Sequence, residues 1–305
     1  MRHVAEPAVA GAVLFRAGFG ANPRPATAAV QHLSLYQKTA RASLVIRARS
    51  LSSSTRKPRV AVLEVLKGHY EGENLRIVPH YIDYTQPLPG VEREVFTRGE
   101  ESILFLVPYV DEFGRRGKPD VYAVVGAAQG KVAVPPEGRE ALIEAIKRFV
   151  QIDRLGQMDR QAVALRGLLR LNNPYLIEAG LVQCRKYHLA TRDDTEVLLR
   201  LMGHRRPDFR SGALALVRQL LLAPPAESSD EVTAGPLDKT LFDQVAGMGR
   251  FDENEEVRRQ AIRTLAAFGD ESALAMIESI GKNDPNQAVR YEAQVAAWRL
   301  RNRLH

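Results

Sequence analysis

A short motif recurs in the second half of the chain, and this repetition constrains the fold more than any other feature of the sequence. Residues 256–261 (EVRRQA) resemble residues 288–293 (AVRYEA), and the same frame fits residues 208–213 (DFRSGA) and, more loosely, residues 176–179 (LIEA). The aligned alanines lie at positions 179, 213, 261 and 293, so successive copies are 34, 48 and 32 residues apart. A unit of this length is typical of a stacked helical hairpin.

The repeated unit resembles the HEAT-type repeat. Val257-Arg258 and Val289-Arg290 are each followed three positions later by alanine, and Asp252 and Asp284 precede the two helices. The resemblance implies an α-solenoid from about residue 157 to 305. A hairpin of this length cannot bury its own apolar face, and alanine lets neighbouring helices approach closely. We expect the two aspartates to cap their helices. An irregular helical bundle is the alternative, because the intervals are unequal.

Two further features shape the predicted solenoid. The interval of 48 residues is longer than the others, and residues 223–238, rich in Pro, Ser, Asp and Gly, are expected to form a loop insert that accounts for the difference. The last helix should bury one face that consists of Val289, Ala293, Ala296, Ala297, Leu300 and Leu304.

The first half of the chain shows a different pattern. Short apolar segments, broken by turn residues, predict six strands at residues 44–49, 60–66, 75–78, 103–107, 121–125 and 132–134. No helical period separates them, which favours a small β-barrel over a doubly wound sheet. The continuous run 103–107 indicates a strand that is covered on both faces. An amphipathic helix around residues 142–150 follows and should cap the barrel or join it to the solenoid.

The turns of this segment resemble the bacterial domains related to the netrin and metalloproteinase-inhibitor OB barrel. Residues 65–68 (VLKG) end one strand, residues 99–101 (GEE) lead into another, and Gly126 and Gly130 bracket a late hairpin. The resemblance covers about residues 40–135 and implies an OB-like barrel and an extracytoplasmic location, periplasmic or secreted, with a cytoplasmic one left open. In the animal inhibitors an N-terminal cysteine chelates zinc, but the single cysteine here is Cys184, so that activity is not implied.

The chain therefore divides into three parts, and its fold class is β plus α in two domains. Residues 1–29 contain an apolar run that Arg16 interrupts and a small-x-small pattern at residues 26–28, so a degraded signal segment and a disordered tail remain alternatives. Residues 30–152 form the OB-like barrel with its C-terminal helix, and residues 153–305 form the solenoid.

The motifs of common enzymes and metal sites are absent from the sequence. The seven histidines form no His-Glu-x-x-His set, residues 126–131 (GAAQGK) do not fit a phosphate loop, and there is no Gly-x-Ser-x-Gly elbow. The acids of residues 193–196 are expected to open a helix, and Cys184 to be a buried apolar residue. We predict no catalytic residue, no cofactor and no bound metal.

The net charge of +7 raises the possibility of nucleic-acid binding. The positive charge is spread along the chain, and only a small cluster, Arg205, Arg206 and Arg210, stands out, which disfavours this class of partner. No apolar run is long enough to span a membrane. Our leading hypothesis is a non-enzymatic scaffold or adaptor that binds a protein partner through the helical-repeat surface. The alternatives are nucleic-acid binding through that basic edge and an enzyme with an unrecognised site. The sequence does not identify the partner.

Overall fold

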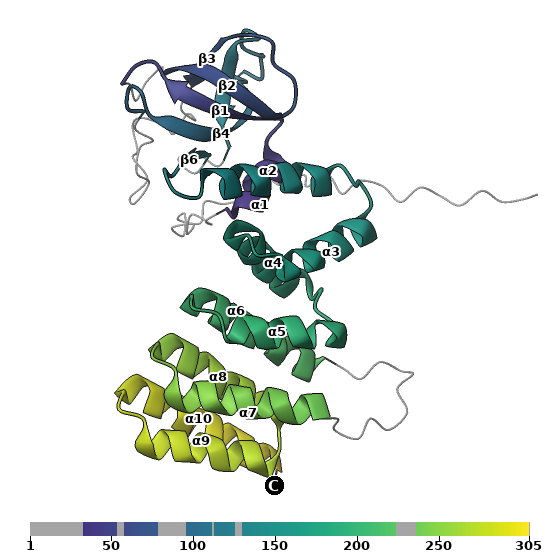
Figure 1. The fold of residues 1–305 in the computed structure, drawn as a ribbon, viewed down its shortest axis with the longest axis vertical. Helices are drawn as coiled ribbons and strands as arrows, with labels where there is room; N and C mark the ends of the chain where they lie inside the picture. The colour runs from purple at the N-terminus through teal and green to yellow at the C-terminus, as the bar shows by residue number, and fades with distance from the viewer. Residues whose placement is uncertain are drawn as a thin grey trace, which may run out of the picture. The chain divides into compact units, whose positions relative to one another are not determined.

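The computed structural model describes residues 33–53, 58–78, 96–111, 113–125, 130–223 and 236–304 (Figure 1). The predictions for residues 1–29 and for Gly126 lie outside these ranges. The described chain forms a small β-barrel followed by a helical solenoid, as the sequence predicted. Each of the six predicted strands is present, and their bounds are β1 (Leu44–Ser50), β2 (Arg59–Lys67), β3 (Asn74–Val78), β4 (Glu101–Pro108), β5 (Val121–Val124) and β6 (Lys131–Ala133).

Five of the strands close into a barrel. The hydrogen-bonded order is β1-β2-β3-β5-β4, and β4 returns to pair with β1, while β6 adds to the edge of β4. The β3–β5 pair is parallel and the other pairs are antiparallel. Alternate residues of β1 point to opposite faces, so that Leu44 and Ile46 lie in the barrel core and Val45 lies in a second core outside it. The closed barrel leaves β1 without a free edge.

Helix α2 (Arg139–Asp153) covers the outside of the barrel. Its residues Leu142 and Ile146 pack with Ile103 and Phe105 of β4, which explains why the run at residues 103–107 is apolar on both faces. Two ion pairs fasten α2 to β2: Lys67 Nζ lies 2.8 Å from Asp153 Oδ2, and Lys147 Nζ lies 2.8 Å from Glu64 Oε1. The helix predicted around residues 142–150 therefore caps the barrel.

The opposite face of α2 packs on the solenoid. Phe149 and Ile152 lie in a cluster with Leu165 and Leu176 of the first solenoid hairpin. Tyr36 of helix α1 (Leu35–Arg41) completes this cluster, with its ring 5.6 Å from that of Phe149 in an edge-to-face arrangement. One helix therefore contributes to the core of both parts. The predicted boundary at residues 152 and 153 lies at the end of this shared helix.

In the described part of the solenoid, successive helices pair into four hairpins: α3 with α4, α5 with α6, α7 with α8, and α9 with α10 (Figure 1). Their bounds are α3 (Met158–Gly167), α4 (Pro174–Tyr187), α5 (Thr195–Met202), α6 (Pro207–Leu222), α7 (Pro236–Phe251), α8 (Glu255–Phe268), α9 (Glu271–Asn283) and α10 (Gln287–Leu304), with short 3-10 turns η2 (Leu168–Arg170) and η3 (Arg192–Asp194). The second helices also contact one another from hairpin to hairpin, α4 with α6, α6 with α8, and α8 with α10.

The repeat register is confirmed for three copies and shifted for the first. Ala213, Ala261 and Ala293 are fully buried, each seven positions after the residue that precedes its helix. The same count in α4, from Asn173, leads to Gly180 and not to Ala179. A Cβ atom on Gly180 would lie only 3.0 Å from Leu169, so the helices approach closely at Gly180 in this copy. The alignment with Ala179 was therefore wrong by one residue.

Two other details differ from the sequence analysis. Helix α7 begins at Pro236, so the last three residues of the predicted 223–238 loop belong to that helix, while residues 224–235 lie outside the described ranges. Helix α1 was not predicted; it begins with a capping box in which the Ser34 hydroxyl accepts from the Gln37 backbone and the Gln37 side chain accepts from the Ser34 backbone. The apolar face predicted for α10 is confirmed, with Leu304 partly buried.

Candidate protein-binding surface of the solenoid

One arginine recurs at the same place in the last three hairpins. Arg210, Arg258 and Arg290 each stand four positions after the residue that precedes their helix. Each donates through Nη1 to two carbonyl oxygens of the turn before its own helix, at 3.0 and 3.0 Å for Arg210, 2.8 and 3.4 Å for Arg258, and 2.8 and 2.9 Å for Arg290. The guanidinium thus satisfies carbonyl oxygens of the turn, which lie outside the hydrogen bonds of the helix.

Two of these arginines also reach the next hairpin. Arg210 Nη2 lies 2.7 Å from Asp252 Oδ1, and Arg258 holds Asp284 with two bonds, Nε to Oδ2 at 2.8 Å and Nη2 to Oδ1 at 3.2 Å. The Asp284 side chain is 1% exposed and that of Arg258 is 10% exposed. We call these two pairs, together with Arg290, the arginine–aspartate ladder. Its fork geometry fixes the orientation of successive hairpins.

The ladder corrects the role predicted for the aspartates. The residues that cap α8 and α10 are Asn254 and Asn286, whose side-chain oxygens accept backbone N–H groups at 2.8 to 3.3 Å. Asp252 and Asp284 stand two positions earlier, where each accepts the backbone N–H of that asparagine and the guanidinium of the preceding hairpin. The prediction that they cap the helices was therefore wrong.

His204 takes the place of the aspartate in the second hairpin. Its Nδ1 accepts the backbone N–H of Arg206 at 3.0 Å, as the aspartates do for the asparagines. Burial, and then the nearby Arg205 and Arg206, lower the pKa of His204 below its ordinary value. In the preceding hairpin, Ile177 stands where the later hairpins have the ladder arginine, so that hairpin supplies no guanidinium to His204. The ladder therefore begins at Arg210.

The structure brings Arg205, Arg206 and Arg210 together but leaves only Arg205 exposed. Arg210 is buried in the ladder. Arg206 stacks on the ring of Phe209 at 4.1 Å and pairs with Asp208 at 2.5 Å, and the hydrogen bond to Asp208 raises the pKa of Arg206 above its ordinary value. Because two of the three charges are already paired, this edge offers little to a phosphate backbone.

An open groove crosses three successive hairpins of the solenoid. It has a volume of about 450 Å³ and lies over α4, α6 and the start of α8. Gly212 lines it where α6 approaches α4 closely, since a Cβ atom at that position would lie 3.0 Å from the Leu181 side chain. We call this hollow the repeat groove. Its apolar part comes from Leu181, Val182, Pro207, Phe209 and Gly212, and its charged rim from Glu178, Arg185, Asp208 and Glu256.

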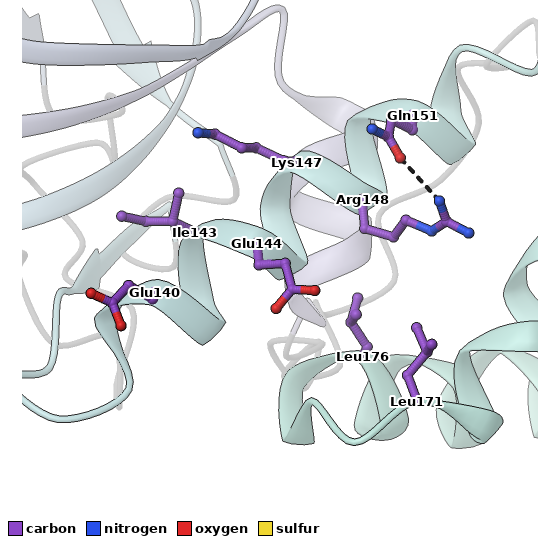
Figure 2. Close-up of a pocket in the computed structure, with 8 residues that line it drawn as sticks. All are labelled: Glu140, Ile143, Glu144, Lys147, Arg148, Gln151, Leu171 and Leu176. Carbon is purple, nitrogen blue, oxygen red and sulfur yellow. Dashed lines mark hydrogen bonds between the residues drawn. The ribbon is translucent and has the colours of Figure 1, made fainter.

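A second groove, of about 620 Å³, lies between α2 and the start of α4 (Figure 2). Ile143, Leu171 and Leu176 supply its apolar surface. Figure 2 shows Glu144 projecting from α2 toward this space and Arg148 turned aside to Gln151, which accepts its hydrogen bond at 3.1 Å. We call this hollow the junction groove.

Polar side chains of the junction groove form hydrogen bonds and ion pairs with other residues of the protein. Glu144 accepts from the Asn173 amide at 3.2 Å, and Lys147 is held by Glu64 of the barrel. Among the residues that the structure describes, neither a histidine nor a cysteine lines the junction groove or the repeat groove. Cys184 is buried, as predicted, and burial raises its pKa to about 12. No cluster of three or more metal-ligating side chains occurs in the part of the chain that the structure describes.

Comparison with known proteins identifies the repeats. Residues 243–298 match the family model of HEAT repeats, and this span runs from within α7 to within α10 and includes the Arg258–Asp284 pair. No curated protein and no solved structure matches the chain. Within the described ranges, no helix is both long and apolar enough to cross a membrane. The C-terminal part is thus a HEAT-like solenoid, preceded by a closed five-stranded barrel.

Proposed function

We propose that this protein is a non-enzymatic adaptor that binds a segment of a protein partner in the repeat groove. The observation that carries the proposal is the groove itself, which crosses α4, α6 and α8 and combines apolar side chains with a charged rim. Stacked repeats create extended surfaces of this kind, on which partner proteins bind. An apolar centre with a polar rim is also the usual composition of a protein interface.

The repeat groove is suited to binding a partner, and its acidic side chains are not free to take part in a reaction. Its acidic rim residues are occupied: Asp208 and Glu178 pair with Arg206, and Glu256 pairs with Arg259. Arg185 is exposed at the edge and can meet a carboxylate of the partner. Affinity would come from apolar contact with Val182 and Pro207, the half-buried apolar side chains of the groove.

The test uses the intact chain as bait and compares the proteins that it retains. Val182→Arg places a charge in the middle of the repeat groove, and we expect a specific partner to be recovered at least about tenfold less. Val163→Arg on α3 is the matched control, because Val163 is 66% exposed and lies outside both grooves. Circular dichroism should give the same spectrum for both variants.

Leu171→Arg, in the junction groove, completes the set of variants. If Val182→Arg retains every partner that the unchanged chain retains, the repeat groove is not the binding site. If Leu171→Arg alone loses the partner, the junction groove is the binding site instead.

We further propose that the barrel is related to the netrin-like OB domains and that the protein acts outside the cytoplasm. The closed five-stranded barrel and its turn pattern support this relationship. Cell fractionation of the full-length protein, followed by determination of its mature N-terminus, tests the location. Recovery with the cytoplasmic fraction, and with Met1 retained, would contradict it.

A further inference from the structure

Helix α10 exposes two large aromatic side chains on one face. Tyr291 is 68% exposed and Trp298 is 62% exposed, and Val295 lies between them, half-buried. Spacings of four and three residues place the three side chains on the same side of the helix. The opposite side of α10 packs into the solenoid core. An exposed aromatic stripe of this kind is unusual on a surface that contacts only water.

The repeat frame shows what this stripe faces. In α8, Arg259 and Arg263 reach Glu292 of α10, and the carbonyl oxygen of Ala266 accepts from Arg303. These three residues therefore face the following hairpin. Thirty-two positions later in the sequence stand Tyr291, Val295 and Trp298. The stripe accordingly lies where α10 would contact one more hairpin, and no described residue covers it.

The ladder is open at the same place. Arg290 bonds to the carbonyls of Asp284 and Pro285 through Nη1, as Arg258 does to those of its own turn. Within the described residues, Arg290 has no carboxylate partner. In the two preceding hairpins, the guanidinium groups of Arg210 and Arg258 are each bound by an aspartate of the following hairpin. By comparison with Arg210 and Arg258, the group that would bind the two remaining guanidinium nitrogens of Arg290 is a carboxylate.

Charge indicates the sign of the occupant. Helix α10 contains four arginines, at positions 290, 299, 301 and 303, and one acid, Glu292, for a net charge of +3. Helix α9 contains Glu271, Glu278 and Lys282, so the net charge of the two helices together is +2, and Arg301 is paired with Glu278. Glu292 is already held by Arg259 and Arg263. A second copy of this chain would bring an equally positive helix, so like charges would oppose that contact. An acidic partner fits better.

We propose that Tyr291, Val295, Trp298 and Arg290 form a docking surface for an acidic helical hairpin of a partner protein. The hairpin stacks on α9 and α10, covers the aromatic stripe and supplies an aspartate or glutamate to Arg290. This surface is separate from the repeat groove, so either proposal can fail while the other stands.

The experiment measures binding of a labelled synthetic peptide to the full chain by fluorescence anisotropy. The acidic probe opens with Asp-Pro-Asn, the turn sequence of residues 284–286, and continues as an amphipathic helix of leucine, alanine and glutamate. A second peptide carries Asn in place of the first Asp, and a third replaces its glutamates by lysine. Trp298, the single tryptophan, gives an independent signal from the docking surface itself.

We expect the acidic peptide to bind saturably and to change the Trp298 emission. Arg290→Gln should weaken its binding by roughly tenfold, the effect of losing a charge-assisted hydrogen bond, while the Asn peptide should bind both proteins equally weakly. Arg299→Gln is the matched control, since Arg299 is exposed on the same helix but outside the stripe and the ladder, and should change binding less than about twofold.

Three results would overturn the proposal. The first is no saturable binding of the acidic peptide, or equal binding of the lysine peptide. The second is an equal effect of Arg290→Gln and Arg299→Gln, which would reduce the contact to general charge attraction. The third is a dimer of the unchanged chain that Trp298→Ala converts to a monomer, because the occupant would then be a second copy.

Discussion

Removing one rung of the ladder should destabilise the C-terminal hairpins strongly. Arg258→Met keeps much of the length and apolar character of the side chain but removes the guanidinium. It leaves the Asp284 carboxylate, which is 1% exposed, with the Asn286 backbone N–H as its remaining hydrogen-bond donor within the described chain. Breaking a buried ion pair by removing one partner costs about 3–5 kcal/mol, because a buried charge remains uncompensated. The carbonyl oxygens of Asp252 and Glu253 lose their donor as well.

The assay is equilibrium unfolding in urea, followed by the fluorescence of Trp298. Trp298, the single tryptophan, lies in α10 and reports on that helix, and Asp284 lies in the turn just before it. Repeats unfold in units that depend on their neighbours, so the transition seen by Trp298 measures the last hairpins. Far-UV circular dichroism, which follows the whole chain, should change less.

Arg250→Met serves as the control, because Arg250 lies in the same hairpin, is exposed and makes one side-chain hydrogen bond of 3.4 Å to Ser279. It should change the free energy of unfolding by less than about 0.5 kcal/mol. Asp284→Asn should cost less in the Arg258→Met protein than in the unchanged chain, with a coupling of about 0.5–3 kcal/mol. If Arg258→Met and Arg250→Met have the same effect, the ladder does not stabilise the stack.

Four other changes have defined outcomes. Gln183→Met should raise the free energy of unfolding by about 1 kcal/mol in urea titration, because Gln183 is 1% exposed and its amide has no hydrogen-bond partner within the described chain; a loss of stability would contradict this. Ala261→Glu should cost several kcal/mol through overpacking and a buried charge, and a change under about 0.5 kcal/mol in thermal melts would refute the repeat register. The hydrogen bond from Arg263 lowers the pKa of Glu292 in the folded state. The ionised Glu292 therefore stabilises the fold above the ordinary glutamate pKa, and this stabilisation is lost as the pH falls through the folded pKa. Glu292→Gln should flatten the decline of stability below about pH 4.5 in acid titration, and an unchanged slope would contradict this. A fragment of residues 153–305 should bind a hydrophobic dye and self-associate, since it lacks α2, and a monodisperse fragment in sedimentation would show that α2 is dispensable to the solenoid.

The elements that the sequence predicts well are those with a local pattern. The six strands follow from short apolar segments between turn residues, and the run at residues 103–107 correctly indicated a strand covered on both faces because α2 packs on its outer side. Helix α1 was missed because seven residues are too few for a helical period to show. Its capping box, Ser34-x-x-Gln37, was the available signal.

The ladder was missed because it is a contact between repeats. An aspartate before a helix is usually its cap, so Asp252 and Asp284 were assigned by local rules. The sequence did contain a signal: Asp284 follows Arg258 by 26 residues, and Asp252 follows Arg210 by 42, which is 26 plus the 16 residues by which that interval exceeds a repeat of 32. The repeat groove depends on packing between hairpins around Gly212, and no local pattern predicts such a space.

The two ends of the solenoid are built differently, and this difference gives the molecule a direction. At the first hairpin, α2 covers Leu165 and Leu176. Lys67 of β2 binds both Asp153 of α2 and the Thr39 carbonyl of α1, and so joins these three elements. Terminal repeats need such a cover, because their outer face would otherwise expose the core to water. The barrel and α2 therefore serve as the cap of that end, and at that end the ladder position holds an isoleucine, so no rung is left open.

At the other end the same positions hold what a further hairpin would use, two exposed aromatic rings and an arginine without a carboxylate. Aromatic side chains that face water gain nothing from burial, so the exposure of Tyr291 and Trp298 supports the docking surface that we propose on α10. The first hairpin is thus covered by α2, whereas no described residue covers the aromatic stripe on α10. A protein that binds one partner along the repeat groove and a second one on α10 would hold the two at a separation fixed by the rigid ladder between them.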